Sequence, residues 1–220
     1  MFDPIARHFK KVGRRAHRDW GVNKAHEDSL TGAAFADFHM RRSRKVLVDS
    51  TEWRWRVRTR KFGSGGKASE ERRTGADGIV EIEVRHLPSG MLDLKGLLVQ
   101  AKKEWSGADP RLAGQVRRME ELAPGCSAAV DYSPRGYSAA AGTVVLEAEG
   151  NRRRVPDSDV VPLGDFLADR FLPCEVGLRG LYYDARRELL HLPPNPARPD
   201  AVALFIPERL RIEVVEIGPR

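Results

Sequence analysis

The sequence predicts a mixed α/β fold, in which a central mixed β-sheet is flanked by helices and followed by a C-terminal α+β extension. Short stretches between residues 51 and 104 show the alternating pattern of strands. A helix with start and stop residues follows over residues 109–125. Beyond Asn151 prolines and arginines become frequent. We therefore expect a basic N-terminal arm or helix (1–22), a core (23–150) and a C-terminal extension or subdomain (151–220).

The charge of the chain favours a polyanionic partner. Its 220 residues include 38 Lys and Arg against 31 Asp and Glu, which gives a formal net charge of +7. Such an excess is most often associated with nucleic acid. No apolar run is long enough to cross a bilayer, and the N-terminus lacks the apolar segment of a secretory signal. We expect a cytoplasmic protein with no membrane partner.

The first core elements are a helix and a basic strand. The pattern of residues 23–45 predicts a helix with a basic C-terminal end. In TEWRWRVRTRKF, residues 51–62, apolar and basic side chains alternate, which predicts a strand with one wet, positive face. The basic side chains that we expect to contact a nucleic-acid backbone from this strand are Arg54, Arg56 and Arg58.

A hairpin and a second helix follow. ADGIVEIEVRH (76–86) and LKGLLVQAKKE (94–104) predict two strands joined by a turn with Pro, Ser and Gly. Asp109 is a candidate N-cap for a helix that ends at Pro124 and Gly125. The remaining expected elements are a strand in CSAAVDYS (126–133), a short helix in 136–150, a short helix near 163–171, and strands in GLYYD, ELLHL and ALFIPERLRIEVVEI.

The second hairpin strand carries a glutamine and a lysine where an apolar run ends. On a strand Gln100 and Lys102 share one face, and burying either side chain is costly unless it is paired. An antiparallel partner brings Asp77, at the start of the first strand, beside them. A metal held by the Asp77 carboxylate, the Gln100 amide oxygen and the Ala101 carbonyl, with Lys102 beside a nucleophilic water, satisfies all of these groups.

This arrangement resembles the PD-(D/E)XK nuclease superfamily, whose pattern is an acidic residue in the first helix, an Asp at a hairpin strand, and (D/E)XK on the next strand. The matches cover roughly residues 24–141: Glu27, Asp77, Gln100-Ala101-Lys102, and Gln115 as an accessory glutamine of the following helix. The resemblance implies a restriction-endonuclease-like core with Glu27, Asp77, Gln100 and Lys102 as catalytic residues. It also implies Mg²⁺ or Mn²⁺ as the metal.

One departure from the superfamily pattern is the glutamine at position 100, as in the QXK variant of type IV restriction enzymes and defence-associated effectors. A neutral ligand removes one charge from the metal site, so Glu27 gains importance. The resemblance implies a magnesium-dependent DNA endonuclease in restriction or anti-phage defence, acting as a homodimer or with a partner protein. RNA is not excluded as a substrate. The alternative is an inactive nucleic-acid-binding or assembly module.

Several acidic residues compete for these roles. Asp77 lies in the loop-like TGADG and has an alternative role as a turn residue. Glu81 and Glu83 share its alternating face and are rival ligands, although an exposed sheet face is the more usual place for them. Asp28 competes with Glu27 in the first helix.

Three further polar residues have open assignments. Gln115 has solvent exposure as its alternative. Lys103 points away from Lys102 by alternation, which indicates a surface charge or a phosphate contact. GSGGKAS (63–69) fails the spacing of a phosphate-binding loop, so we expect a mobile loop that brings Lys67 to nucleic acid.

Overall fold

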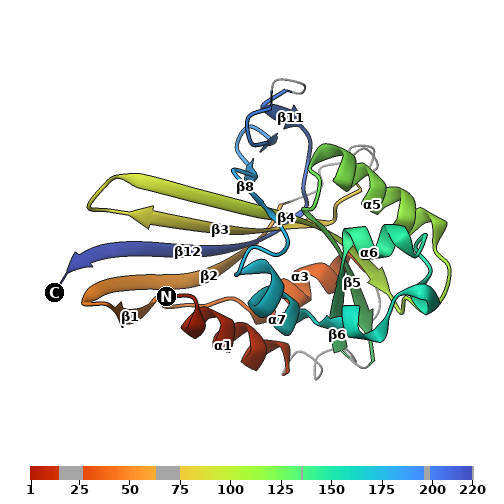
Figure 1. Ribbon diagram of the computed structural model, residues 1–220, viewed down its shortest axis with the longest axis horizontal. Helices are drawn as coiled ribbons and strands as arrows, with labels where there is room; N and C mark the ends of the chain where they lie inside the picture. The colour runs from red at the N-terminus through yellow and green to blue at the C-terminus, as the bar shows by residue number, and fades with distance from the viewer. Residues whose placement is uncertain (15–26, 63–74, 135, 196–198, 220) are drawn as a thin grey trace.

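The computed structural model describes residues 1–14, 27–62, 75–134, 136–195 and 199–219, with the backbone alone for 27–30 and 33. The protein is a mixed α/β fold with a large central mixed sheet and a small antiparallel sheet near the C-terminus (Figure 1). The predicted α/β class is thereby confirmed at this coarse level. In the view of Figure 1 the small sheet lies above the large one, and helices α1, α3 and α7 lie below it.

The described helices are α1 (Asp3–Gly13), α3 (Glu27–Asp37), α5 (Pro110–Leu122), α6 (Gly142–Glu147) and α7 (Leu163–Phe166), with the short helical turns η2 (Arg152–Arg154), η3 (Asp157–Asp159) and η4 (Leu167–Phe171). The strands are β1 (Arg44–Val48), β2 (Thr51–Lys61), β3 (Gly78–His86), β4 (Met91–Lys103), β5 (Ser127–Ser133), β6 (Gly136–Ala141), β7 (Val161–Pro162), β8 (Leu178–Arg179), β9 (Tyr182–Asp184), β10 (Leu189–His191), β11 (Ala201–Ala203) and β12 (Glu208–Pro219).

The large sheet has the order β1-β2-β12-β3-β4-β5-β6-β7, with β8 paired to β4, and the small sheet has the order β11-β10-β9. The expected hairpin is present as antiparallel β3 and β4, in which Gly78 pairs with Val99. After β4 the chain crosses through α5 and returns as β5, which is parallel to β4. Strand β6 then pairs antiparallel with β5 on one side and with the short edge strand β7 on the other.

Each face of the large sheet carries its own apolar cluster. Because successive side chains of a strand point to opposite faces, Val80 and Leu97 join a cluster with α1, α3 and α7, while Ile79 and Leu98 join a second cluster. The second cluster packs against α5, α6 and the small sheet, and includes the fully buried Leu112. The large sheet is therefore covered on both faces, which suits the apolar runs of β3 and β4.

The helix expected over 23–45 is shorter in the structure. Residues 23–26 lie outside the described part, α3 ends at Asp37, and residues 44–48 form β1 instead. The prediction was wrong for this last stretch because a tight turn follows it: Asp49 and Ser50 have φ of 48° and 64°. A two-residue turn with positive φ at both positions joins antiparallel strands.

The helix expected over 136–150 is also shorter. Residues 136–141 form β6 and only 142–147 are α-helical. The alanines of GYSAAA favour a helix in isolation, but the backbone of this stretch pairs with β5 and β7 in the large sheet, so tertiary context decides the conformation.

The expected boundary at residue 150 does not coincide with a division of the large sheet. The last strand, β12, comes from the C-terminal segment and lies between β2 and β3, antiparallel to β2 and parallel to β3. Such an insertion has no local sequence signature, because the pairing is made across more than a hundred residues of chain. The short helix near 163–171 and the strands of GLYYD and ELLHL are present where expected. In the stretch ALFIPERLRIEVVEI (203–217), the strand begins only at Glu208, as β12; Ala203 ends β11, and residues 204–207 lie in no strand.

The N-terminal segment forms a helix over Asp3–Gly13, one of the two forms expected for it. Within the residues that the structure describes, no helix has the length and apolar character needed to span a bilayer.

Candidate active site at the ends of β3 and β4

Hydrogen bonds bring Asp77 and Gln100 together at the paired ends of β3 and β4. The Asp77 N–H donates to the Val99 carbonyl at 2.8 Å, which continues the β3–β4 pairing by one residue. The Asp77 carboxylate accepts from Gln100 Nε2 at 2.5 Å and from the Ala101 N–H at 2.8 Å. The three residues that the sequence assigned to a metal site therefore lie in mutual contact.

The Gln100 amide joins the other two groups through its nitrogen. Gln100 is only 4% exposed, and Nε2 donates both to Asp77 and to the Ala101 carbonyl, the latter at 3.0 Å. Its Oε1 is buried and accepts no hydrogen bond from the described residues. The amide group thus satisfies the two neighbouring oxygens while leaving its own oxygen without a partner.

Lys102 lies two residues further along β4, on the same face as Gln100. Its Nζ is 3.0 Å from Asp109 Oδ2, and Asp109 also accepts from the Leu112 N–H at 2.8 Å as the N-cap of α5. Burial raises the pKa of Asp109, but the Leu112 hydrogen bond and the Lys102 ammonium outweigh it, so this pKa lies below its usual value. Lys102 therefore connects the end of β4 to the start of α5.

Gln115 reaches the same region from α5. A side chain added at Gly75, whose φ is +71°, would collide with the Gln115 backbone, so α5 packs closely against the turn that leads to Asp77. Gln115 Oε1 is buried without a hydrogen-bond partner in the described part of the chain. The alternative expectation for Gln115 was a solvent-exposed side chain. The burial of its amide oxygen contradicts that expectation for this atom.

Two residues near this site were missed by the sequence analysis: Tyr132 of β5 and Glu208 of β12. Burial raises the pKa of Tyr132, and the carboxylates of Asp77 and Glu208 raise it further, so both negative charges lie near the phenol. Glu208 is 4% exposed and pairs in register with Gly78, next to Asp77. Burial raises the pKa of Glu208 to about 7, against the opposing effect of Lys61, whose Nζ lies 3.6 Å away. Glu208 begins an alternating strand, which is the only sequence feature that draws attention to it.

The rival ligands Glu81 and Glu83 take part in a separate network. Glu81 is 2% exposed and accepts from the Tyr183 N–H at 2.6 Å. Glu83 forms ion pairs with Arg85 and Arg211. Glu81 thus contacts β9 of the small sheet and Glu83 contacts the neighbouring strand β12, and both are buried, so the expectation of an exposed sheet face was wrong for them.

The arginines of β2 lie on a partly exposed face, as the alternation indicated, but each has an acidic neighbour. Arg54 lies 3.1 Å from Glu52, while Arg56 and Arg58 both pair with Glu213 of β12. Their side chains remain 46%, 37% and 52% exposed, respectively. Lys103 is exposed on the opposite face from Lys102.

The side chains of three other predicted residues, Glu27, Asp28 and Lys67, lie outside the described part of the chain. The backbone of Glu27 and Asp28 is described and begins α3, whereas no part of Lys67 is described. Among the side chains that are described, no group of three or more His, Cys, Asp or Glu is arranged to hold a metal ion.

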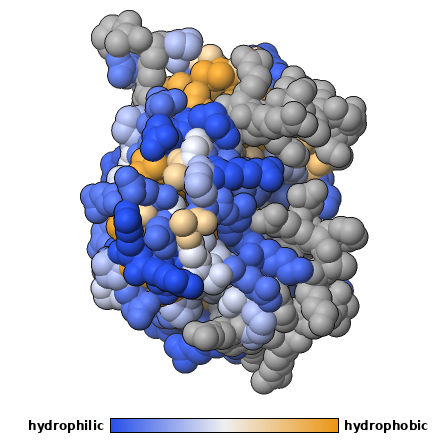
Figure 2. Space-filling model, turned by 90° about the vertical axis from the view of Figure 1, so that its right-hand side faces the viewer, coloured by the Kyte–Doolittle hydropathy of each residue, from blue (hydrophilic) through white to orange (hydrophobic). Residues whose placement is uncertain are grey.

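The side of the molecule formed by α5 and α6 has a largely hydrophilic surface with small apolar patches (Figure 2). Exposed arginines stand on α5 and η2 at this side: Arg111, Arg117, Arg153, and Arg154, which is paired with Glu149. Because Arg111 follows the helix start that Lys102 and Asp109 connect to β4, positive charge lies close to the candidate site.

Comparison with known proteins gives no family: no family model, no curated protein and no solved structure matches this chain.

Proposed function

We propose that this protein is a metal-dependent DNA endonuclease that hydrolyses phosphodiester bonds, with a role in restriction or anti-phage defence implied by the QXK resemblance. The observation that carries the proposal is the contact of Asp77, Gln100 and Ala101 at the ends of β3 and β4, with Lys102 on the same face. The order of hairpin, crossover helix and parallel strand is the order expected for a restriction-endonuclease-like core.

The donor set suits a hard divalent cation. Mg²⁺ and Mn²⁺ prefer oxygen ligands, and the Asp77 carboxylate, the Ala101 carbonyl and the orphaned Oε1 of Gln100 supply three oxygens within one contact cluster. Rotation of the Gln100 amide by half a turn would direct Oε1 toward the other two oxygens. Three adjacent oxygens with no proton among them, one of them from a carboxylate, favour a bound cation.

The residues of the site would divide the work between them. Asp77, Gln100 and the Ala101 carbonyl would hold the metal, with Glu27 as the expected additional acidic ligand. A divalent ion at this place polarises a scissile phosphate and lowers the pKa of a bound water. Lys102 would position the attacking water and stabilise developing negative charge, while Asp109 fixes its ammonium. Gln115 would act from α5 as an accessory glutamine of the same site.

Contacts with the nucleic-acid backbone would come from several basic surfaces. The exposed arginines of α5 and η2 flank the site, and Arg54, Arg56 and Arg58 of β2, together with Lys67 and Lys103, remain the residues proposed from the sequence. Each arginine of β2 must exchange or share its acidic neighbour to bind phosphate, so its net contribution should be smaller than that of an arginine without one.

One observation favours the second candidate function, a nuclease-like module that binds nucleic acid without cutting it. The Gln100 NH₂ group already donates to the Asp77 carboxylate and to the Ala101 carbonyl. With a glutamate at position 100, a cation would be needed to bridge these oxygens. The neutral Gln100 amide instead donates hydrogen bonds to the Asp77 and Ala101 oxygens, so both are satisfied without a metal.

Nicking of supercoiled plasmid DNA separates the two functions. The nuclease predicts relaxed and linear products that appear with Mg²⁺ or Mn²⁺ and disappear with EDTA, and an RNA substrate in parallel reactions defines the sugar preference. Binding of the same DNA in a mobility-shift assay without any cutting, in either metal, establishes the module instead.

Replacement of Gln100 by Glu tests whether this side chain is a metal ligand. The change substitutes a carboxylate for the amide at nearly constant volume, which removes the hydrogen bond to Asp77 and leaves facing carboxylates that need a cation. We expect divalent-metal affinity, measured by calorimetry, to rise about tenfold or more. Asn195→Asp is the matched control, since it makes the same amide-to-carboxylate change at an exposed residue between β10 and β11, away from the candidate site. Unchanged metal binding in Gln100→Glu would place residue 100 outside the metal site.

A further inference from the structure

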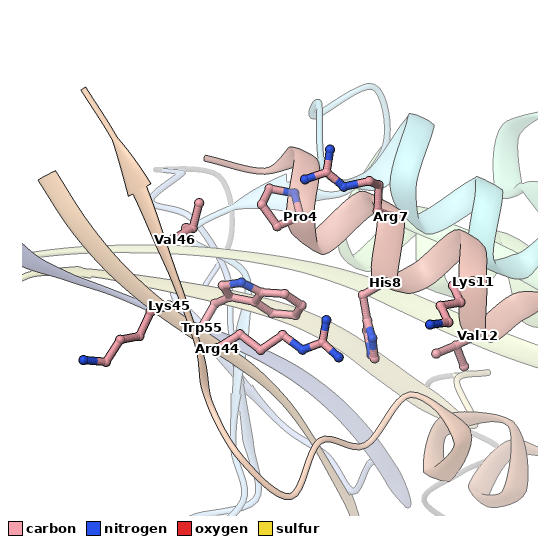
Figure 3. A pocket seen from close by; sticks show the side chains of 9 residues that line it. All are labelled: Pro4, Arg7, His8, Lys11, Val12, Arg44, Lys45, Val46 and Trp55. Atoms are coloured by element: carbon pink, nitrogen blue, oxygen red, sulfur yellow. The ribbon is translucent and has the colours of Figure 1, made fainter. Parts of the chain in front are cut away.

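A cavity separate from the candidate active site lies between α1 and the strands β1 and β2, on the face of the sheet that carries α1, α3 and α7 (Figure 3). Its volume of about 450 Å³ is in the range of small-molecule sites. We call it the basic pocket, because the charged side chains among its lining residues are all basic: Arg7, Lys11, Arg44 and Lys45, beside His8.

Most of this positive charge is not neutralised within the described part of the chain. Lys45 lies 3.3 Å from Glu52, whereas the ion pairs of the described residues include none made by Arg7, Lys11 or Arg44. Like charges gathered around one cavity repel each other, and the repulsion is relieved when an anion enters.

His8 shows that two of these cations, Lys11 and Arg44, converge. Its Nε2 lies 3.2 Å from the Phe38 carbonyl, an acceptor, so Nε2 carries the proton and Nδ1 is the unprotonated nitrogen of the neutral ring. Burial lowers the pKa of His8, and the charges of Arg44 and Lys11 lower it further against the effect of the Phe38 carbonyl. Charges on α1 and on β1 therefore act on one ring inside the pocket.

Trp55 adds a hydrogen-bond donor with no acceptor. The residue is 2% exposed, and its indole Nε1 has no hydrogen-bond partner among the described residues. Figure 3 shows the indole at the centre of the pocket, with Arg44 and His8 beside it. A buried N–H without a partner is destabilising, and an acceptor oxygen that reaches it as the lining side chains adjust would remove that cost.

We propose that the basic pocket binds a small phosphate monoester of nucleotide size. A phosphate group carries two negative charges near neutral pH and offers several acceptor oxygens, which match the guanidinium groups, the Lys11 ammonium and the indole N–H. Apolar side chains line the rest of the cavity and suit the organic group of the ester: Pro4, Val12 and Val46. The proposal stands on α1, β1 and β2 alone and does not depend on nuclease activity.

The test is calorimetric titration of the full chain with inorganic phosphate, adenosine 5′-monophosphate and adenosine. We expect both phosphates to bind, the nucleotide more tightly, and adenosine not to bind. Arg44→Gln and Lys11→Gln should each weaken nucleotide binding about tenfold, since each removes a charge-assisted hydrogen bond from an exposed residue whose loss the fold tolerates. Trp55→Phe keeps an aromatic side chain, although a smaller one, removes the N–H, and should weaken binding several-fold.

Arg42→Gln is the matched control, because it removes the same charge from an exposed residue near Arg44 that does not line the cavity. Its affinity should equal that of the parent. Short oligonucleotides with and without a 5′-phosphate identify the source of the phosphate. Arg44-dependent binding of the phosphorylated form alone assigns the pocket to strand ends. If neither oligonucleotide binds in this way, the pocket is assigned to free nucleotides. A parent chain that binds no phosphate at millimolar concentration, or an Arg42→Gln defect equal to that of Arg44→Gln, overturns the proposal.

Discussion

Asp77→Asn and Lys102→Ala should both abolish or strongly reduce cleavage, but with different effects on the metal. Asp77→Asn removes the anionic ligand at nearly constant volume and keeps an oxygen to accept the Ala101 N–H, so the hairpin should remain intact. Divalent-metal affinity should fall and cleavage should be lost. Binding of DNA without metal should survive or improve, because repulsion of the phosphate is relieved.

Lys102→Ala should leave metal affinity close to that of the parent while the cleavage rate falls about a hundredfold or more, as for the loss of a preorganised electrostatic donor. The Lys102 ammonium pairs with Asp109, so its removal takes no described ion pair away from the proposed metal ligands. Calorimetry with Mn²⁺ and single-turnover cleavage rates measure the two effects separately.

Positions outside the candidate site provide the controls. Lys10→Ala on α1 removes an ammonium that is likewise paired with an aspartate, since Lys10 Nζ lies 2.7 Å from Asp169, and should leave the single-turnover rate unchanged. Asp49→Asn makes the same change as Asp77→Asn in a turn whose positive φ asparagine tolerates. If folded Asp77→Asn and Lys102→Ala cut at the parental rate, the cleavage site lies elsewhere in the chain.

Glu208→Gln should stabilise the protein at high pH and have little effect at low pH. Burial raises the pKa of Glu208 from its ordinary value near 4.5 to about 7, so the folded state holds a proton that the unfolded state releases between these values. The stability contributed by this proton is fully present below pH 4.5 and is lost as the pH rises through 7. The difference of roughly 2.5 pKa units corresponds to about 3 kcal/mol.

Denaturant unfolding at pH 4, 6 and 8 measures this effect as the difference between variant and parent. The parent should lose stability relative to Glu208→Gln as the pH rises, and the difference should reach its full value at pH 8. Burial also raises the pKa of Asp131, to about 6, but that residue is present in both proteins, so the difference isolates Glu208. A difference that is constant with pH would show that Glu208 titrates normally in the folded state.

The contact between Asp77 and Gln100 could be predicted from the sequence, because both residues lie at the ends of one hairpin. Asp77 and Gln100 belong to two strands joined by a short turn, and an antiparallel hairpin places the start of one strand beside the end of the other. The N-cap role of Asp109 likewise follows from the residues around it. The hydrogen-bond pattern of the Gln100 amide was not accessible, because it depends on side-chain packing at the strand ends.

By itself the sequence determined the α/β class, the β3–β4 hairpin, the basic alternation of β2 and the helix after β4, since each depends on periodicity, capping or turn chemistry over a few residues. The tertiary structure alone decided the features made by distant segments. It inserted β12 between β2 and β3, placed Glu208 next to the candidate site, gave Arg56 and Arg58 their acidic partner, and formed the basic pocket from α1 and the β1–β2 hairpin. These contacts depend on the packing of apolar faces from distant parts of the chain. They therefore cannot be predicted from any short stretch of residues.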